Sequence, residues 1–207
     1  MSLTLVLLRH GRSRADDENV HEGKYDSPLT ETGRIQAMAL AARWHQEQVH
    51  FDAIAASSLC RASETAVIIG ESLGIKPQYA TDLMERDNGV AAGMPLDEVE
   101  RQYPQALRVS PYEPWFVNGE SEAEFHRRAG KVLERLVRTE FQSVLVVAHG
   151  GILNAILRNA INAPLPTFGG PYFAFGDTGF AQLIYESQRH AWCVTRINDT
   201  HHLQEAK

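Results

Sequence analysis

The sequence has only two cysteines among its 207 residues, Cys60 and Cys193. They lie far apart and form no C-x-x-C pair, whereas disulfide frameworks and cysteine zinc sites need several cysteines at close, regular spacing. The pattern argues against both kinds of site, and we expect reduced thiols in a cytoplasmic protein. Cys60 is interpreted as a small buried hydrophobic residue, with sensitivity to oxidation as the alternative.

Long apolar runs and an excess of basic residues are also missing. No apolar run approaches the roughly 20 residues that cross a bilayer, and the apolar start of the chain is too short and wrongly flanked for a signal peptide. The formal net charge is −6, whereas proteins that coat nucleic acid cluster Lys and Arg. We therefore expect no membrane and no nucleic-acid partner, and any phosphate recognition must be local.

The length and the 43% hydrophobic content suit a single domain over residues 1–207. Short apolar runs predict strands over residues 3–8, 51–56, 76–82, 143–149, 179–186 and 191–197. Helical spacing predicts helices over residues 31–44, 62–73, 96–103, 121–141 and 152–161, with Thr30 and Ser121 as N-caps. This alternation is typical of a three-layer α/β/α sandwich with a mostly parallel central sheet, made mixed by the final antiparallel hairpin.

Two segments show no regular spacing of apolar residues. Residues 13–28 contain Gly23 and Pro28 and predict a long loop, which in a compact domain is usually functional. Residues 107–120 contain two prolines and three aromatics and predict an ordered loop or lid. The aromatic residues that either line a substrate pocket or simply pack are Trp115, Phe116, Phe168, Tyr172 and Phe173. His201 and His202, in a polar tail, are interpreted as solvated rather than metal-binding.

Two predicted strands end alike, in VLLRHG with His10 and in VVAHGG with His149. The carboxyl ends of neighbouring parallel strands share one edge of a sheet, so we expect the two imidazoles side by side. Arg61 follows a third strand at the start of a helix and can reach the same place. Guanidinium groups and helix N-termini suit a compact anion, and a phosphoryl group fits best.

A neutral imidazole can attack phosphorus and form a phosphohistidine. The sequence has no Walker-type loop and no clustered Asp or His for metal ions, so we expect neither a metal nor a cofactor, and the arginines must supply the charge stabilisation. The alternatives are that His10 is only a polar strand end and that Arg61 only solvates its helix.

Four motifs in order carry a resemblance: LLRHG, SSLCRASETA, Glu85 ahead of Gly89 and Gly93, and VAHGG. Together they resemble the histidine phosphatase superfamily, in the branch that includes cofactor-dependent phosphoglycerate mutases, over residues from about 3 to about 161. The resemblance implies a phosphoglycerate-mutase-like fold, with His10 as the phosphorylated nucleophile and Glu85 as general acid and base. The residues that it implies for phosphate binding are Arg9, His10, Arg61, His149 and Gly150, with His149 also counted as catalytic.

The candidate substrate contacts are Ser13, Asp16, Glu22 and Gly23. Two positions depart from the family pattern: Arg12 stands where relatives often carry Glu or Gln, and Asp16 where they often carry an asparagine. A carboxylate at position 16 would repel a phosphate dianion unless it pairs with Arg12 or Arg14, so a changed substrate preference is one interpretation.

These patterns predict a metal-independent phosphatase that hydrolyses small phosphate monoesters through a phosphohistidine. The segment between Glu85 and His149 is shorter than in the mutases, which insert basic residues there to orient their substrate, and this favours hydrolysis. A cofactor-dependent phosphoglycerate mutase and a non-catalytic phosphate-binding module are the alternatives. The sequence identifies neither the natural substrate nor the oligomeric state, and a homodimer is left open.

Overall fold

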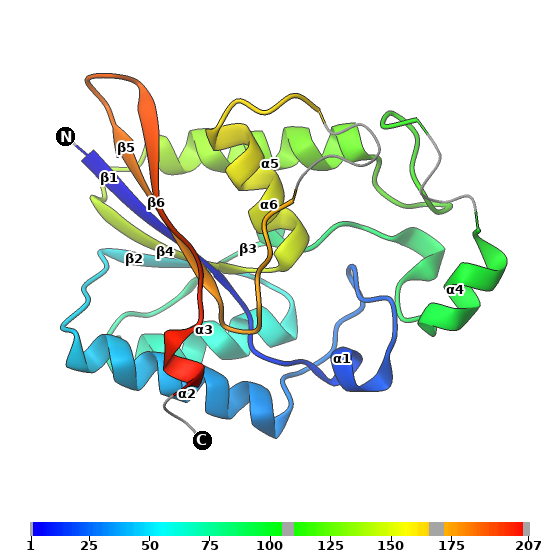
Figure 1. Ribbon diagram of the computed structural model, residues 1–207, viewed down its shortest axis with the longest axis horizontal. Helices are drawn as coiled ribbons and strands as arrows, with labels where there is room; N and C mark the ends of the chain where they lie inside the picture. The colour runs from blue at the N-terminus through cyan, green and yellow to red at the C-terminus, as the bar shows by residue number, and fades with distance from the viewer. Residues whose placement is uncertain (1, 105–109, 166–171, 205–207) are drawn as a thin grey trace.

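The computed structural model describes residues 2–104, 110–165 and 172–204, and a six-stranded sheet runs through its centre (Figure 1). The strands are β1 (Ser2–Arg9), β2 (Ala53–Ser57), β3 (Gln78–Ala80), β4 (Ser143–Ala148), β5 (Phe180–Glu186) and β6 (Ala191–Asp199). The α-helices are α1 (Arg14–Glu18), α2 (Glu31–Gln46), α3 (Cys60–Leu73), α4 (Leu96–Gln102), α5 (Glu122–Val137) and α6 (Gly150–Ala160).

The sheet has the order β3-β2-β4-β1-β5-β6, so β1 and β4 are neighbours near its middle. They run parallel, with Arg9 opposite Ala148 at their carboxyl ends. Of the six described strands only β5 runs against the others, because it pairs antiparallel with both β1 and β6. The predicted mixed, mostly parallel sheet is therefore confirmed.

Alternate residues of β1 pack on opposite faces of the sheet, as the period of a strand requires. Val6 and Leu8 lie in the apolar cluster formed with α2 and α3, and Leu5 and Leu7 lie in the cluster formed with α5 and α6. Figure 1 shows these two helix pairs on opposite sides of the sheet. All four side chains are buried, which stabilises the fold by about 1.5–3 kcal/mol for each. The three-layer architecture is thus confirmed, and it leaves the strand ends free to carry polar groups.

The predicted helix starts are also confirmed by their caps. The hydroxyl of Thr30 accepts the N–H of Gly33 at 3.1 Å at the start of α2. Ser121 and Glu124 form a reciprocal capping box at the start of α5. None of the described helices has the length and apolar character needed to cross a membrane.

Local details differ from the predictions in several places, and the helix predicted to run to residue 141 ends at Val137. Residues 13–28 are not loop throughout, since Ser13 caps the short helix α1 in a capping box with Asp16. Strand β3 covers only Gln78–Ala80, because a 3₁₀ turn, Thr81–Leu83, ends it. Helix α6 begins at Gly150, directly after His149. In the predicted loop of residues 107–120, residues 107–109 lie outside the described part, and the remainder forms turns and bends.

His202 is not solvated, as its sequence context predicted, but buried. The hydroxyl of Thr178 donates to the carbonyl of Asp177, and so accepts a hydrogen from Nε2 of His202 at 2.7 Å. Burial lowers the pKa of His202 to about 4. The polar tail is therefore anchored beneath β5 by a neutral imidazole, while the adjacent His201 is exposed.

Candidate active site

His10 and His149 lie together at the carboxyl edge of the sheet. Their ring centroids are 5.0 Å apart and the rings are tilted by 60°. The parallel register of β1 and β4 produces this pairing, since each histidine directly follows its strand. Both imidazoles are almost completely buried, so the predicted neighbourhood of the two histidines is confirmed.

The hydrogen bonds of His10 define its tautomer. Nδ1 lies 2.7 Å from the carbonyl oxygen of Gly11, which can only accept, so Nδ1 carries the hydrogen. Nε2 is then unprotonated and accepts a hydrogen bond from Nε of Arg61 at 3.2 Å. Burial, with the charges of Arg61 and Arg9, holds the pKa of His10 well below its usual value. The result is a neutral imidazole whose lone pair faces a cation, as a nucleophile requires.

Arg61 lies in the first turn of α3 and is fully buried. Its Nη1 and Nη2 atoms donate to the carbonyl oxygens of Tyr25 and Gly23 at 2.8 and 2.9 Å. Gly23 has φ +51, and a Cβ there would lie 2.6 Å from Nδ2 of Asn88. Glycine therefore lets the loop present its carbonyl to the guanidinium. The sequence predicted Gly23 as a substrate contact, whereas in the structure it orients Arg61.

Arg9 ends β1 and points into the same region. Nη1 donates to the carbonyl of Phe175 at 2.9 Å, and the guanidinium lies 3.5 Å from carboxylate oxygens of Asp16 and Asp177. Asp16 thus pairs with Arg9 and not with Arg12 or Arg14, the two partners that the sequence offered. The capping box of α1 turns Asp16 toward Arg9, while Arg12 pairs with Asp17 and Arg14 with Glu18 on the surface.

His149 precedes α6 and hydrogen-bonds through Nε2 to the hydroxyl of Ser57 at 2.8 Å. Its Nδ1 atom is buried and has no hydrogen-bond partner within the described residues. Burial, followed by the charges of Arg61, His10 and Arg9, holds its pKa well below the usual value. A buried, unpaired nitrogen beside two guanidinium groups fits a polar ligand at this place.

The carboxylate of Glu85 lies at the N-terminus of α6, the helix that follows His149. Its two carboxylate oxygens accept the N–H groups of Gly151 at 2.8 Å, Ile152 at 3.1 Å and Arg86 at 2.8 Å. A Cβ on Gly151 would lie 2.4 Å from Oε1 of Glu85, whereas a Cβ on Gly150 would meet no atom within 4 Å. Gly151 therefore makes room for the carboxylate, and Gly150 faces open space.

Sequence reasoning missed the role of Arg128. This residue of α5 donates to the carbonyl oxygens of Asp82, Met84 and Glu85 and pairs with Glu120 at 2.7 Å. It thus fixes the backbone that carries Glu85. Nothing local in the sequence signals a contact with a residue 43 positions away.

Ser13, Asp16 and Glu22 form a polar cluster beside Arg9 and Arg61. The Ser13 hydroxyl lies 2.6 Å from Oε1 of Glu22 and 2.9 Å from Oδ2 of Asp16. Oε1 of Glu22 is also 3.5 Å from Nε of Arg61. The structure therefore brings these predicted contact residues to the same edge as the histidines.

The predicted aromatic residues mainly pack. Phe116 is buried and makes an edge contact with His21, with ring centroids 5.3 Å apart. The Trp115 ring lies under the guanidinium carbon of Arg86, with 4.2 Å to its centroid. Phe173 packs against the core and Tyr172 is exposed. Phe168 lies outside the described residues.

Cys60 is partly exposed and donates to Glu64 at 3.0 Å, which corrects its interpretation as a buried hydrophobic residue.

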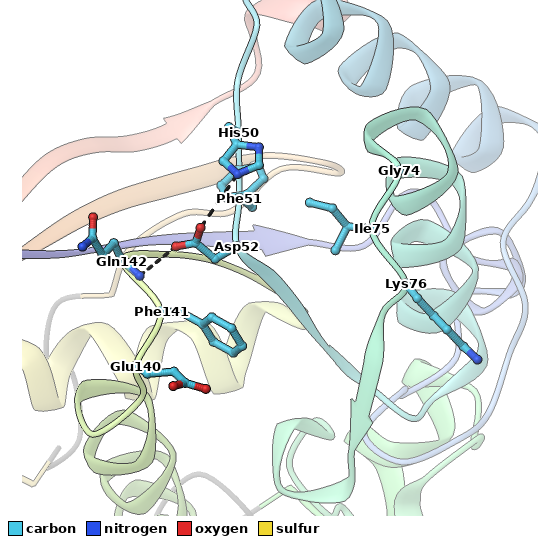
Figure 2. A pocket seen from close by; sticks show the side chains of 9 residues that line it. All are labelled: His50, Phe51, Asp52, Gly74, Ile75, Lys76, Glu140, Phe141 and Gln142. Atoms are coloured by element: carbon cyan, nitrogen blue, oxygen red, sulfur yellow. Dashed lines mark hydrogen bonds and ion pairs between the residues drawn. The ribbon is translucent and has the colours of Figure 1, made fainter.

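A cavity of about 710 Å³ opens at the opposite, amino edge of the sheet (Figure 2). It is lined by residues that precede β2, β3 and β4, among them Asp52, Lys76 and Gln142. Asp52 accepts the N–H groups of Gln142 and Ser143, both at 2.8 Å, so its carboxylate holds two strand starts together. No predicted site residue lies there. In the described part of the chain, no group of three or more His, Cys, Asp or Glu is placed to hold a metal ion.

Comparison with known proteins places this geometry among phosphatases. The profile of the histidine phosphatase superfamily (branch 1) matches residues 5–200. Phosphoserine phosphatase 1 of Hydrogenobacter thermophilus is 29% identical over 205 residues, covering 97% of this chain and 94% of the relative. The 2,3-bisphosphoglycerate-dependent phosphoglycerate mutase of Bartonella tribocorum is 32% identical, covering 76% and 81%. A mycobacterial glucosyl-3-phosphoglycerate phosphatase complexed with VO3 superposes with a TM-score of 0.81 at 28% identity, covering 95% and 98%.

Proposed function

Because the chain belongs to branch 1 of the histidine phosphatase superfamily, we propose that it is a metal-independent phosphatase of small phosphate monoesters that works through a phosphohistidine on His10. The observation that carries the proposal is the unprotonated Nε2 of His10, buried and facing Arg61 at 3.2 Å. Relatives named as phosphatases cover nearly the whole chain, which supports hydrolysis as the reaction. A cytoplasmic location, with Cys60 and Cys193 as free thiols, completes the proposal.

In the first step Nε2 of His10 attacks phosphorus, and the bond from phosphorus to the ester oxygen breaks as the N–P bond forms. The guanidinium groups of Arg9 and Arg61 stabilise the charge on the transferring phosphoryl group. The buried Nδ1 of His149 forms a further hydrogen bond with the phosphoryl group. The amide N–H of Gly150, at the N-terminus of α6, is placed to donate to the same group. The arginines thus supply the electrostatic stabilisation that a metal ion gives in other phosphoryl-transfer enzymes.

Glu85 transfers a proton in both steps, as general acid in the first and as general base in the second. It protonates the departing alcohol oxygen, and the carboxylate then removes a proton from the water that attacks the phosphohistidine. Hydrolysis releases inorganic phosphate and restores the neutral imidazole. Gly151 and Arg128 act as positioning residues, because one makes room for the Glu85 side chain and the other holds its backbone.

A panel of phosphate esters tests this function, and it includes phosphoserine because a relative is named for that substrate. We expect hydrolysis that is unchanged by EDTA and needs no 2,3-bisphosphoglycerate. Interconversion of 2- and 3-phosphoglycerate that depends on the bisphosphate would instead make the chain a mutase, the activity named for another relative. Binding of phosphate without either reaction would indicate a non-catalytic module.

A further inference from the structure

The hydroxyl group of Ser13 makes short contacts with two carboxyl groups but has only one hydrogen to donate to them. Its hydroxyl oxygen accepts the N–H of Asp16 at 3.3 Å, and it lies 2.6 Å from Oε1 of Glu22 and 2.9 Å from Oδ2 of Asp16. The same Oδ2 also accepts the main-chain N–H of Ser13 at 2.7 Å. The fully buried Ser13 thus joins two carboxyl groups through one hydroxyl.

A serine hydroxyl has one hydrogen and can donate it to one of these carboxyl groups only. If both were ionised, the other short oxygen–oxygen contact would hold two lone pairs against each other. One more hydrogen resolves the conflict: a protonated Glu22 donates to Ser13, and Ser13 donates to Asp16. Every contact in the cluster then contains a hydrogen.

Glu22 is the better place for that hydrogen than Asp16. Oδ2 of Asp16 already accepts an N–H, and Oδ1 of Asp16 faces Arg9 at 3.5 Å, which are contacts that an ionised carboxylate makes. The nearest cation to Glu22 is Arg61, whose Nε–H is already donated to His10. Burial raises the pKa of Glu22, and the charge of Asp16 adds to the shift, against the opposing effects of Arg61, Ser13 and Arg9.

We propose that Glu22 is a neutral carboxylic acid beside the phosphoryl site, with its O–H donated to Ser13, so that oxyanion binding at this site depends on one retained proton. The proposal rests on the proposed function, because it takes the place between His10 and Arg61 as the phosphoryl position. Three charged groups face Glu22: Arg61 on α3, Arg9 at the end of β1, and Asp16 on α1.

The protonation state of Glu22 decides how well the arginines can bind an anion. An ionised Glu22 places a negative charge 3.5 Å from Nε of Arg61, where it repels a dianion that uses the same guanidinium. A neutral Glu22 leaves the positive charge of Arg61 to the ligand. Above the pH at which Glu22 ionises in the ligand-free protein, the dianion must bind together with one proton. Affinity for the dianion then falls by up to about tenfold for each pH unit.

Tungstate is a suitable probe, because it is a tetrahedral dianion that carries no proton of its own near neutral pH. Its affinity for the unaltered chain, for Glu22→Gln and for Asp16→Asn is measured by calorimetry between about pH 5.5 and about pH 8. We expect the affinity of the unaltered chain for tungstate to fall as the pH rises. Glu22→Gln should bind tungstate about as tightly as the unaltered chain at about pH 5.5, and at least about tenfold more tightly than the unaltered chain at about pH 8. Any proton uptake by His10 and His149 on anion binding occurs in all three proteins, so it cancels when their affinities are compared.

Asp16→Asn is the matched control, since it removes one negative charge from the same cluster. It should keep the slope of the unaltered chain, with the loss of affinity beginning at a lower pH because the charge of Asp16 no longer raises the pKa of Glu22. Calorimetry of the unaltered chain in buffers of different ionisation enthalpy should also show uptake of about one proton at the alkaline end. Absence of any proton uptake by the unaltered chain would overturn the inference without a variant, and uptake smaller by about one proton in Glu22→Gln separates Glu22 from His10 and His149.

Parallel pH curves for the unaltered chain and Glu22→Gln would overturn the inference and leave the phosphatase assignment intact. Loss of the slope in Asp16→Asn instead would assign the proton to Asp16 and overturn it equally. A chain that binds no tungstate at any pH would overturn the proposed phosphoryl site, and the inference with it.

Discussion

The two edges of the sheet are built from the same strands but carry different kinds of polar groups. At the amino edge, around the cavity in Figure 2, Asp52 is paired with main-chain N–H groups and the side chain of His50 is 81% exposed. At the carboxyl edge, His10, His149 and Arg61 are buried and face one another. Burying such groups costs free energy unless they are paired. The comparison therefore teaches that buried, converging polar groups distinguish this site from the amino edge.

Apart from the nucleophile His10, the largest effect should come from Arg61. Replacing it with alanine removes a buried cation and its bonds to a phosphoryl group, each worth about 1.5–3 kcal/mol. We expect kcat/KM for phosphate esters to fall by about 100-fold or more. Thermal unfolding of the variant serves as the control, because Gly23 and Tyr25 also lose a donor. A folded variant with less than a twofold loss would remove Arg61 from the phosphoryl site.

The next effect concerns the carboxylate at the start of α6. Glu85→Gln should slow esters with poor leaving groups by about 100-fold, because their alcohols need a proton to depart. p-Nitrophenyl phosphate should be slowed much less, because its leaving group is stable as an anion. Equal slowing of both substrates would mean that Glu85 only supports the N-terminus of α6.

His202 separates burial from function, because it is a buried imidazole after β6 that hydrogen-bonds to Thr178 and not to His10, His149 or Arg61. Its pKa is about 4 in the folded protein, below the usual value near 6.5 that applies when unfolded. The unfolded chain therefore binds more protons between these values, so stability is fully present above about pH 6.5 and is lost as pH falls toward about 4.

Comparing unfolding free energies of the unaltered chain and His202→Gln isolates this contribution. Between about pH 7 and about pH 5 the unaltered chain should lose roughly 2 kcal/mol more than the variant. Identical losses in the two proteins would show that His202 is not held neutral in the folded state. Phosphatase activity at neutral pH should be similar in both, since His202 contacts no phosphoryl-binding group.

The smallest effect is expected at the amino edge. Lys76→Ala and His50→Ala alter the cavity in Figure 2 but leave the carboxyl edge untouched. Surface substitutions of this kind change energies by about 0.5 kcal/mol or less, so kcat/KM should stay within about twofold. A large loss in either variant would break the contrast between the two edges.

The sequence predicts the carboxyl edge well because its signals are local. Apolar runs that stop at RHG and AHGG identify strand ends, and parallel pairing then brings His10 and His149 together. The Thr30 and Ser121 caps follow from equally local patterns. Short α1 also had a readable signal, since Ser13 and Asp16 have the spacing of a capping box.

The contacts that the sequence does not predict are those between distant segments. Asp16 faces Arg9 rather than Arg12 because the capping box fixes its direction. Arg128 reaches the Glu85 backbone, and His202 reaches Thr178, only after whole helices and strands have packed. Periodicity and composition contain no record of such pairs, so a charged or polar side chain in a helix or tail is interpreted as solvated.

Trapping the covalent intermediate tests the central claim most directly. The protein is mixed briefly with a radiolabelled phosphate ester, quenched without acid because phosphohistidine is acid-labile, and mapped by peptide analysis. We predict one labelled peptide carrying phosphate on His10, and neither label nor turnover in His10→Ala. Label on another residue, or undiminished turnover in His10→Ala, would contradict the account.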